Sequence, residues 1–253
     1  MIRLGRISYV NMAPVFHRLD VEVEEVHGVP TELNARLLAG DIDLAPISSI
    51  EYARHAERLR ILPRLCVSSE GAVDSIQLVS RTPLEHIDSV AVTPESATSV
   101  VLTKVLLPDA VLVPLGKKAE AKLLIGDAAL RSAFEDPTPH HDLGRLWLER
   151  TGLPMVFAVW ACPDPPPPGI LELEEALVSS VRLARAEPER LAFEASTTYG
   201  YPAGLLARYF EKLRYRFGER EREGLHAFLE LAVEAGELDA VPELRFVGAG
   251  VPA

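Results

Sequence analysis

Short apolar runs alternate with stretches of helical periodicity over the first 160 positions of the chain. The apolar runs predict strands at residues 2–7, 21–26, 42–46, 75–80, 89–92, 111–114, 122–125 and 156–160. The stretches between them predict helices at 12–19, 30–39, 48–56, 97–107, 126–134 and 142–151. Strands that alternate with helices are typical of an α/β fold.

The pattern changes after Pro163. Four consecutive prolines at 165–168, followed by Gly169, predict an extended or turn segment, because proline removes a backbone donor and fixes φ. Beyond this segment the periodicity predicts helices at 170–186, 188–196, 202–214 and 219–236, and a final strand at 244–247. The apolar positions of 202–214 serve either the core or an interface, so the sequence leaves the oligomeric state open.

Four of the apolar runs end in small polar clusters. These clusters are residues 8–11 (SYVN), Ser48 with Ser49, residues 93–99 (TPESATS), and Gly126 with Asp127. In an open α/β sheet, ligands bind in the crevice beyond the carboxyl ends of the strands. Hydroxyls and free N–H groups at the following helix starts are suited to carboxylates or phosphates. The pattern therefore predicts a pocket for a small anion, assembled from several parts of the chain.

Two strands predict connections between two lobes. Residues 77–81 lead into Pro83, and residues 156–160 lead into Pro163; a proline soon after a strand ends it sharply. We therefore expect lobe one to comprise 1–80 and 162–253, and lobe two to comprise 81–161. A ligand between such lobes is enclosed by hinge closure.

Composition narrows the classes of partner. The formal net charge of −11 argues against nucleic acid or an anionic membrane as partner, because both reward a basic surface. The first residues lack the apolar core of a signal peptide, and no stretch reaches the length of a membrane span, which predicts a cytoplasmic protein. Cys66 and Cys162 are too few for a disulfide scaffold or a zinc cluster, and we expect two buried free thiols.

Familiar catalytic motifs are absent, and the sequence indicates no cofactor and no metal. His140 and His141 have no further ligand at metal spacing, so we interpret them as loop residues ahead of a helix capped by Asp142. Asn11 serves either an Asx turn or an amide that points into the cleft. Ser48 and Glu51 have the spacing of a capping box, which leaves Ser49 free for a ligand.

Two further polar segments have two interpretations each. In the cluster Ser96, Thr98 and Ser99 one hydroxyl suffices to cap the following helix, and the others are free for an anion. Residues 68–75 form either a surface turn or a loop that wraps a ligand with backbone N–H groups.

The order of these segments resembles a known family, the chorismate dehydratases of the futalosine route to menaquinone. The resemblance covers nearly the whole chain, and each segment alone is weakly specific. It rests on residues 8–14 (SYVNMAP), 40–52 (GDIDLAPISSIEY), 71–75 (GAVDS), 96–100 (SATSV), 125–130 (IGDAAL), 142–144 (DLG) and 151–160 (TGLPMVFAVW). Met155 replaces the phenylalanine typical of the last segment, a swap that packing tolerates.

The resemblance implies a two-lobed fold like that of type II periplasmic binding proteins, with the ligand cleft between the lobes. It also implies a lyase that converts chorismate, a small dicarboxylate, to 3-[(1-carboxyvinyl)oxy]benzoate without a cofactor. It links Asn11 to catalysis and Ser75 to the active site. The residues that we expect to hold the substrate are Ser48, Ser49, Gly71, Val73, Ser75, Ser96, Thr98 and Ser99.

Two alternatives remain at this point. The sister family, 1,4-dihydroxy-6-naphthoate synthase, shares the fold and the first motif, and in it His140 or His141 becomes the candidate base. It differs around 151–160, where this chain follows the dehydratase pattern. From a different class, the chain is a cytosolic anion-binding module without catalysis.

Overall fold

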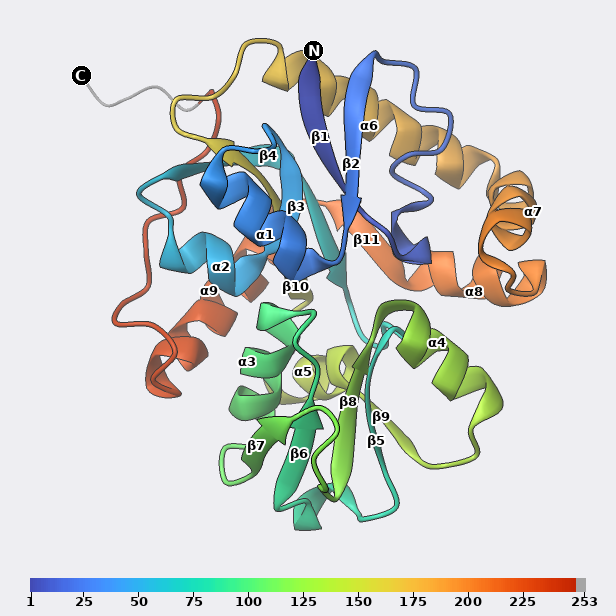
Figure 1. The fold of residues 1–253 in the computed structure, drawn as a ribbon, viewed down its shortest axis with the longest axis vertical. Coiled ribbons are helices and arrows are strands. Elements are labelled where there is room, and N and C mark those ends of the chain that lie inside the picture. Colours follow the sequence, from blue (N-terminus) through green and yellow to red (C-terminus); the bar gives the residue numbers. More distant parts are fainter. Residues whose placement is uncertain (249–253) are drawn as a thin grey trace.

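The computed structural model describes residues 1–248 as two lobes joined by two connections (Figure 1). In lobe one, β1 is hydrogen-bonded in parallel to β2, and Gly5 N–H donates to the Leu44 carbonyl at 2.7 Å, next to β3. β10 pairs antiparallel with both β3 and β4, and β4 pairs with β11. The strands are β1 (Ile2–Ile7), β2 (Val23–Gly28), β3 (Ala45–Ser48), β4 (Leu59–Ser69), β10 (Met155–Pro163) and β11 (Leu213–Arg216).

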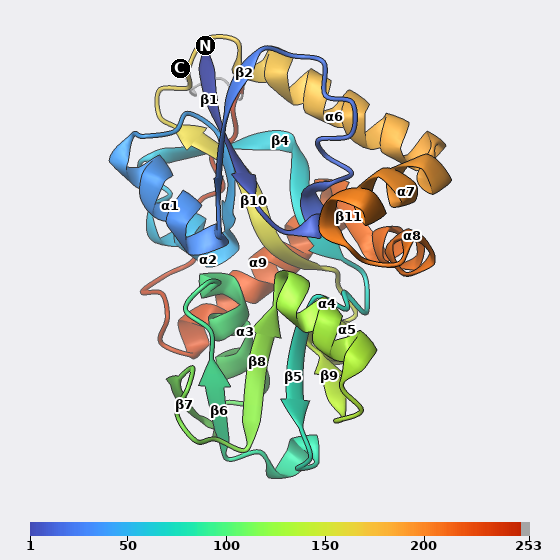
Figure 2. The same ribbon diagram turned by 45° about the vertical axis from the view of Figure 1, so that its right-hand side comes forward.

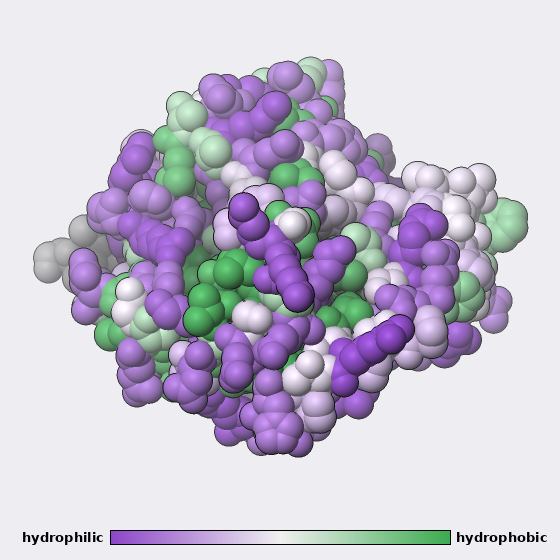
Figure 3. Space-filling model, turned by 60° about the horizontal axis from the view of Figure 1, so that its bottom comes forward, coloured by the Kyte–Doolittle hydropathy of each residue, from purple (hydrophilic) through white to green (hydrophobic). Residues whose placement is uncertain are grey.

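Lobe two is built on a five-stranded sheet in the order β7-β6-β8-β5-β9. Its strands are β5 (Ile76–Ser80), β6 (Ser89–Val92), β7 (Val111–Pro114), β8 (Ala121–Ile125) and β9 (His140–Asp142). Its helices are the 3-10 helix η2 (Leu84–His86) and the α-helices α3 (Ala97–Leu106), α4 (Gly126–Glu135) and α5 (Leu143–Thr151). The free end of this lobe is mainly hydrophilic, with a smaller apolar area at its centre (Figure 3).

The two lobes share one strand order. In lobe one the order is β2-β1-β3-β10-β4, and in lobe two it is β7-β6-β8-β5-β9, so each lobe places its second strand outside its first. In lobe one the chain moves from β1 outward to β2 and then returns past β1 to β3, and in lobe two it moves from β6 outward to β7 and then returns past β6 to β8. β6 and β8 are parallel, and the bridge from Leu4 to Leu44, beside β3, is parallel too. Such switch points open a crevice at the carboxyl ends of the strands. The carboxyl ends of β1, β6 and β8 point toward the other lobe (Figure 1).

The remaining helices cover lobe one. They are η1 (Val10–Met12), α1 (Pro30–Ala39), α2 (Ser49–Arg54), α6 (Ile170–Ala186), α7 (Pro188–Tyr199), α8 (Ala203–Lys212) and α9 (Glu219–Glu234). Helices α6, α7 and α8 lie together on one side of this lobe (Figure 2). Helix α9 reaches lobe two, where the rings of Phe228 and Trp147 meet edge to face at 6.1 Å.

Strand pairing differs from the lobe boundaries that we expected at 80 and 161. β5 pairs with β8 and β9 in lobe two, whereas β10 pairs with β3 and β4 in lobe one. The chain therefore passes between the sheets at residues 70–75 and 152–154, before each of these strands instead of after it. The prolines at 83 and 163 end strands, and they do not mark the crossings.

Two predicted elements are wrong, and one long strand was missed. Residues 13–18 form turns and a bend after η1 instead of the helix expected at 12–19, and Arg18, with φ of +51°, lies outside the helical region. Residues 244–247 contribute one bridge, Phe246 to Ile61. β4 escaped prediction because Arg60, Pro63 and Arg64 interrupt its apolar run.

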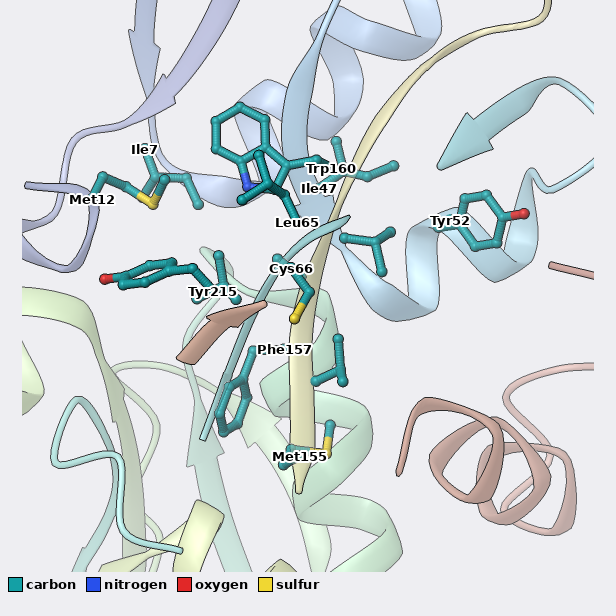
Figure 4. Packing of buried hydrophobic residues seen from close by; sticks show 14 of the residues in the cluster. Ile7, Met12, Ile47, Tyr52, Leu65, Cys66, Met155, Phe157, Trp160 and Tyr215 are labelled. Carbon is teal, nitrogen blue, oxygen red and sulfur yellow. The ribbon is translucent and has the colours of Figure 1, made fainter. Parts of the chain in front are cut away.

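The core of lobe one gathers side chains from β1, β3, β4 and β10 around Trp160 and Leu65 (Figure 4). Trp147 and Trp160 are fully buried and belong to the core. Cys66 and Cys162 are buried free thiols, as expected. Burial raises the pKa of the Cys162 thiol to about 12, so it stays protonated and unreactive.

Candidate active site

A narrow cavity of about 50 Å³ lies between the two lobes, where the carboxyl ends of their strands meet. It receives residues from the ends of β1, β3 and β8 and from the loop after β6. It therefore joins the four polar clusters noted in the sequence. The lining residues are Ile7, Tyr9, Asn11, Pro30, Ser48, Val67, Ser75, Ile76, Ser96, Ser99, Ile125, Gly126, Phe157 and Ala158.

Four helices begin at this cavity. Pro30 is the first residue of α1, Ser48 precedes α2, Ser96 caps α3, and Gly126 is the first residue of α4. The first N–H groups of a helix lack partners within it, and the helix dipole places partial positive charge there. The described lining carries no arginine or lysine, so this cavity attracts anions through helix N-termini.

Asn11 lies in η1, directly after the first strand. Its backbone carbonyl accepts a hydrogen bond from the hydroxyl of Tyr215 on β11. Its side-chain Oδ1 is buried and has no hydrogen-bond partner among the described residues. A buried amide oxygen without a partner is costly, and in a cleft it suits a donor carried by a ligand. The geometry therefore favours the cleft interpretation of Asn11 over an Asx turn.

Direct hydrogen bonds close the lobes onto each other beside Asn11. The Tyr9 hydroxyl donates to the Glu95 carboxylate at 2.9 Å, and Val10 N–H donates to Asp127 Oδ1 at 2.9 Å. Burial, with the nearby Glu95 carboxylate, raises the pKa of Tyr9, so this phenol remains a donor. Burial also raises the pKa of Asp127, while the Val10 N–H opposes that shift.

The closed arrangement leaves little room for a ligand. Small-molecule pockets usually enclose about 300–1,000 Å³, far more than the roughly 50 Å³ between these lobes. Entry of a drug-sized substrate therefore requires the lobes to separate, and closure then excludes water from the bound molecule.

Ser48 and Ser49 have different surroundings. Ser48 lines the cavity, and its Oγ accepts from Asn34 Nδ2 at 3.2 Å. The expected capping box is absent, because the Ser48 side chain makes no cap hydrogen bond. The Ser49 hydroxyl donates to the Val156 carbonyl at 2.7 Å, so it lies outside the cavity lining and is not free for a ligand.

The hydroxyl residues at the start of α3 also differ in whether they line the cavity. Ser96 Oγ caps the helix by accepting from Ser99 N–H at 3.2 Å, and the hydroxyls of Ser96 and Ser99 are 2.9 Å apart. Both line the cavity. Thr98 does not, because its Oγ1 faces Ile50 N–H across the lobes at 3.4 Å. The expected ligand contact of Thr98 is thus replaced by a contact between lobes.

The turn before β5 is held by Asp142. One carboxylate oxygen accepts from Asp74 N–H at 2.7 Å and Gln77 Nε2 at 2.7 Å, and both oxygens lie 3.0 Å from Val73 N. The carboxylate also caps α5 through Arg145 N–H, as expected. Burial raises the pKa of Asp142, and these N–H donors oppose the shift.

This arrangement decides which residues of the turn reach the ligand. Ser75 lines the cavity, whereas Gly71 and Val73 do not. The Gly71 carbonyl accepts from the Ser69 hydroxyl, and the Val73 N–H is bound to Asp142. Gly71 and Val73 therefore shape the turn instead of contacting a ligand.

The histidine pair lies outside the cavity lining. His140 Nε2 is 2.9 Å from the Ser132 hydroxyl, and His141 Nε2 is buried without a partner among the described residues. No group of three metal-ligating side chains occurs within residues 1–248. The same part of the chain has no helix long and apolar enough to span a bilayer.

Sequence reasoning missed the aromatic walls of the site. Tyr9 and Phe157 line the cavity, and a Cβ on Gly126 would lie 2.6 Å from the Tyr9 ring. Tyr9 is part of the polar cluster at 8–11, so its position in that cluster was the available signal. Phe157 gave none, because an aromatic residue within an apolar strand is typical of a core.

The chain is similar in sequence to proteins of menaquinone biosynthesis. A family model described as menaquinone biosynthesis matches residues 2–234. A chorismate dehydratase of Thermus thermophilus is 38% identical over 260 residues, covering 90% of this chain and 93% of that protein. A chorismate dehydratase of Campylobacter jejuni is 36% identical over 167 residues, covering 62% of this chain and 66% of that protein.

Solved structures show the same fold. Protein AF1704 of Archaeoglobus fulgidus superposes with a TM-score of 0.79 at 19% identity, over 94% of this chain and 98% of that one. The alkanesulfonate-binding protein SsuA of Xanthomonas axonopodis has a TM-score of 0.70 at 14% identity, over 97% and 96%. The fold is thus periplasmic-binding-protein-like, as expected. The chain belongs to the menaquinone biosynthesis family, and within it to the group that contains the chorismate dehydratases.

Proposed function

We propose that this protein is a hydro-lyase that dehydrates chorismate to 3-[(1-carboxyvinyl)oxy]benzoate, the first step of the futalosine route to menaquinone. The observation that carries this proposal is the buried Oδ1 of Asn11, unpartnered at an anion-attracting cavity in a chain related to chorismate dehydratases along nearly its whole length. We place the protein in the cytoplasm.

The protein has little covalent chemistry to contribute to this reaction. The bond between the ring and its 4-hydroxyl breaks, and a neighbouring ring C–H bond gives its electron pair to the new double bond. The proton and the hydroxide leave as water, and the ring becomes aromatic. Aromatisation supplies the driving force, so the protein contributes orientation, support for the leaving hydroxyl and exclusion of bulk water.

The cavity fits a dicarboxylate. Chorismate carries two carboxylates, and helix N-termini face the cavity from both lobes: α1 and α2 from lobe one, α3 and α4 from lobe two. We assign one carboxylate to Ser48 and the start of α2, and the other to Ser96, Ser99 and the start of α3. Ser75 approaches the ring from the turn that Asp142 holds.

Asn11 is assigned to the reacting end of the substrate. Its Oδ1 accepts, and its Nδ2 donates, so the amide supports either the leaving hydroxyl or a substrate carboxylate that relays the proton. An amide does not titrate, so Asn11 positions these groups and does not remove the proton itself. Four residues outside the cavity lining stabilise the segments around it through their hydrogen bonds. They are Ser49, Gly71, Val73 and Thr98.

The test is turnover of chorismate, followed by the absorbance of the aromatic product. We expect the wild-type protein to form this product and Asn11→Ala to lose about a hundredfold in kcat. Ser132→Ala, outside the cavity, serves as the control and keeps wild-type turnover. Near-normal turnover by Asn11→Ala would refute its assigned role. Binding of chorismate by the wild type without conversion would refute the proposed reaction and favour an anion-binding module.

A further inference from the structure

A concavity larger than the cavity between the lobes lies on lobe one, between β4, α6, β11 and the start of α9. It is a groove of about 660 Å³, rimmed by Arg64, Arg182, Arg185, Arg216 and Arg222. In a chain whose formal net charge is −11, five arginines around one groove create a local positive field. The N-terminus of helix α9 also lies at this groove, and there the Glu221 carboxylate accepts from the Gly218 N–H at 2.9 Å, so the arginines and not the helix end supply the positive charge.

The arginines of the rim differ in how far they are already neutralised. Arg64 is paired with Glu174 and Glu175, and Arg182 lies 3.8 Å from Glu175. Arg222 lies over the rings of Phe217 and Phe246. Arg185 and Arg216 form no ion pair within residues 1–248, and Glu219 is the acidic residue in the described lining. Two guanidinium groups are therefore available to an anion.

A second pocket, of about 360 Å³, adjoins the groove. The two share Val181, Arg185 and Tyr215. The pocket lies among α6, α7 and α8, which stand side by side in Figure 2. Its other lining residues are largely apolar and comprise Pro14, Ala184, Pro188, Leu191, Ala207, Phe210, Leu213, Glu211 and Arg214. A basic groove thus lies beside a largely apolar pocket, and Arg185 lines both.

We propose that the groove and the adjoining pocket together bind an amphipathic organic anion that has one hydrocarbon chain. The anionic head lies between Arg185 and Arg216, because guanidinium groups bind phosphate or carboxylate in a bidentate fashion. The hydrocarbon part fills the pocket along Leu191, Ala207 and Phe210, because burial of apolar surface stabilises it there. The site is independent of the reaction proposed above and lies outside the cavity between the lobes.

This site lies next to the segment after β1 that contains Asn11. Tyr215 lines both the groove and the pocket, and its hydroxyl donates to the carbonyl of Asn11. A ligand in the groove therefore touches the side chain that supports Asn11 from behind.

The test is a binding titration of the whole protein with dodecyl phosphate, kept below its micellar concentration. Inorganic phosphate serves as a head without a tail, and dodecyl maltoside as a tail without a charge. We expect dodecyl phosphate to bind at least about tenfold more tightly than either. The double variant Arg185→Ala/Arg216→Ala should weaken dodecyl phosphate binding about tenfold or more, and Ala207→Glu should weaken it through the pocket.

Arg36→Ala, which removes an exposed arginine on α1, is the matched control and should bind like the wild type. Thermal melting of each variant shows that it is folded before its affinity is compared. Dodecyl phosphate binding that is unchanged in Arg185→Ala/Arg216→Ala would overturn the proposal, and so would equal affinity for dodecyl maltoside. If inorganic phosphate bound as tightly as dodecyl phosphate, the pocket would have no role.

Discussion

The hydroxyl of Tyr215 donates a hydrogen bond to the backbone carbonyl of Asn11, 204 positions earlier in the chain. Tyr215 lies on β11, which pairs with β4, so the contact fixes the loop after β1 to the far edge of the same lobe. Burial raises the pKa of Tyr215 well above its ordinary value, so the phenol is protonated and remains a donor at neutral pH.

Removal of this hydroxyl should displace Asn11, although Tyr215 itself does not line the cavity. We expect Tyr215→Phe to lower kcat about tenfold and to change KM less, because the amide is misplaced in the reacting complex. The lost hydrogen bond should reduce the free energy of unfolding by about 1 kcal/mol. Tyr199→Phe, on α7, is the control, and an equal loss of kcat in both variants would contradict this role.

Gly126 allows the lobes to close. A Cβ there would lie 2.6 Å from the Tyr9 ring, and φ is +56°. Gly126→Ala should therefore hold the lobes apart, seen as a larger radius of gyration by small-angle scattering, and raise KM for chorismate. Gly40→Ala shares the strain of a positive φ, +79°, with nothing within 4 Å. Similar scattering by the two variants would argue against a steric role for Gly126.

Glu95 joins the lobes through the Tyr9 hydroxyl. Hydrogen bonds to charged groups contribute about 1.5–3 kcal/mol when well formed. Glu95→Ala should therefore shift the population toward the open arrangement and raise KM several-fold, with a smaller change in kcat. Glu85→Ala, on η2, is the control. Unchanged scattering and unchanged KM in Glu95→Ala would show that this contact does not govern closure.

Asp142 holds the turn that presents Ser75. Asp142→Asn keeps the size of the side chain but replaces one acceptor oxygen with a donor. Either Asp74 N–H and Gln77 Nε2, which bind Oδ2, or Arg145 N–H, which binds Oδ1, then loses its partner. We expect a loss of about 1–3 kcal/mol in the free energy of unfolding by urea, together with reduced turnover. Asp109→Asn, on an exposed loop, should change neither quantity. Retention of wild-type stability by Asp142→Asn would refute this assignment.

The Arg3–Asp43 pair predicts how stability depends on acid. Arg3 lowers the pKa of Asp43 below its ordinary value of 3.8. The folded state therefore binds this proton less readily than the unfolded state, and the contribution is complete above pH 3.8 and is lost as pH falls through the folded pKa. Asp43→Asn should thus destabilise the protein near neutral pH and approach the wild type in acid, measured by urea unfolding. A difference that is constant with pH would contradict the pairing.

The sequence determined the features that arise from neighbouring residues. Hydrophobic periodicity identified the α/β class, the strands β1, β6 and β7 and the helices of the C-terminal half, because each pattern is local. The polar clusters after the strands indicated Asn11, Ser48, Ser96 and Ser99, which the structure brings to one cavity. Their position at strand ends already implied a shared location, since the carboxyl ends of parallel strands meet at one edge of a sheet.

Only the tertiary structure decided which hydroxyls remain available and which strands belong to which lobe. Ser48 and Ser49 are adjacent in sequence, yet Ser49 is bound to the carbonyl of Val156, more than 100 positions away. The placement of β5 in lobe two and of β10 in lobe one likewise depends on pairing with strands remote in the chain. Such contacts depend on the register of distant backbone groups, which local periodicity does not encode. For the same reason the Tyr215–Asn11 contact has no signal in the sequence.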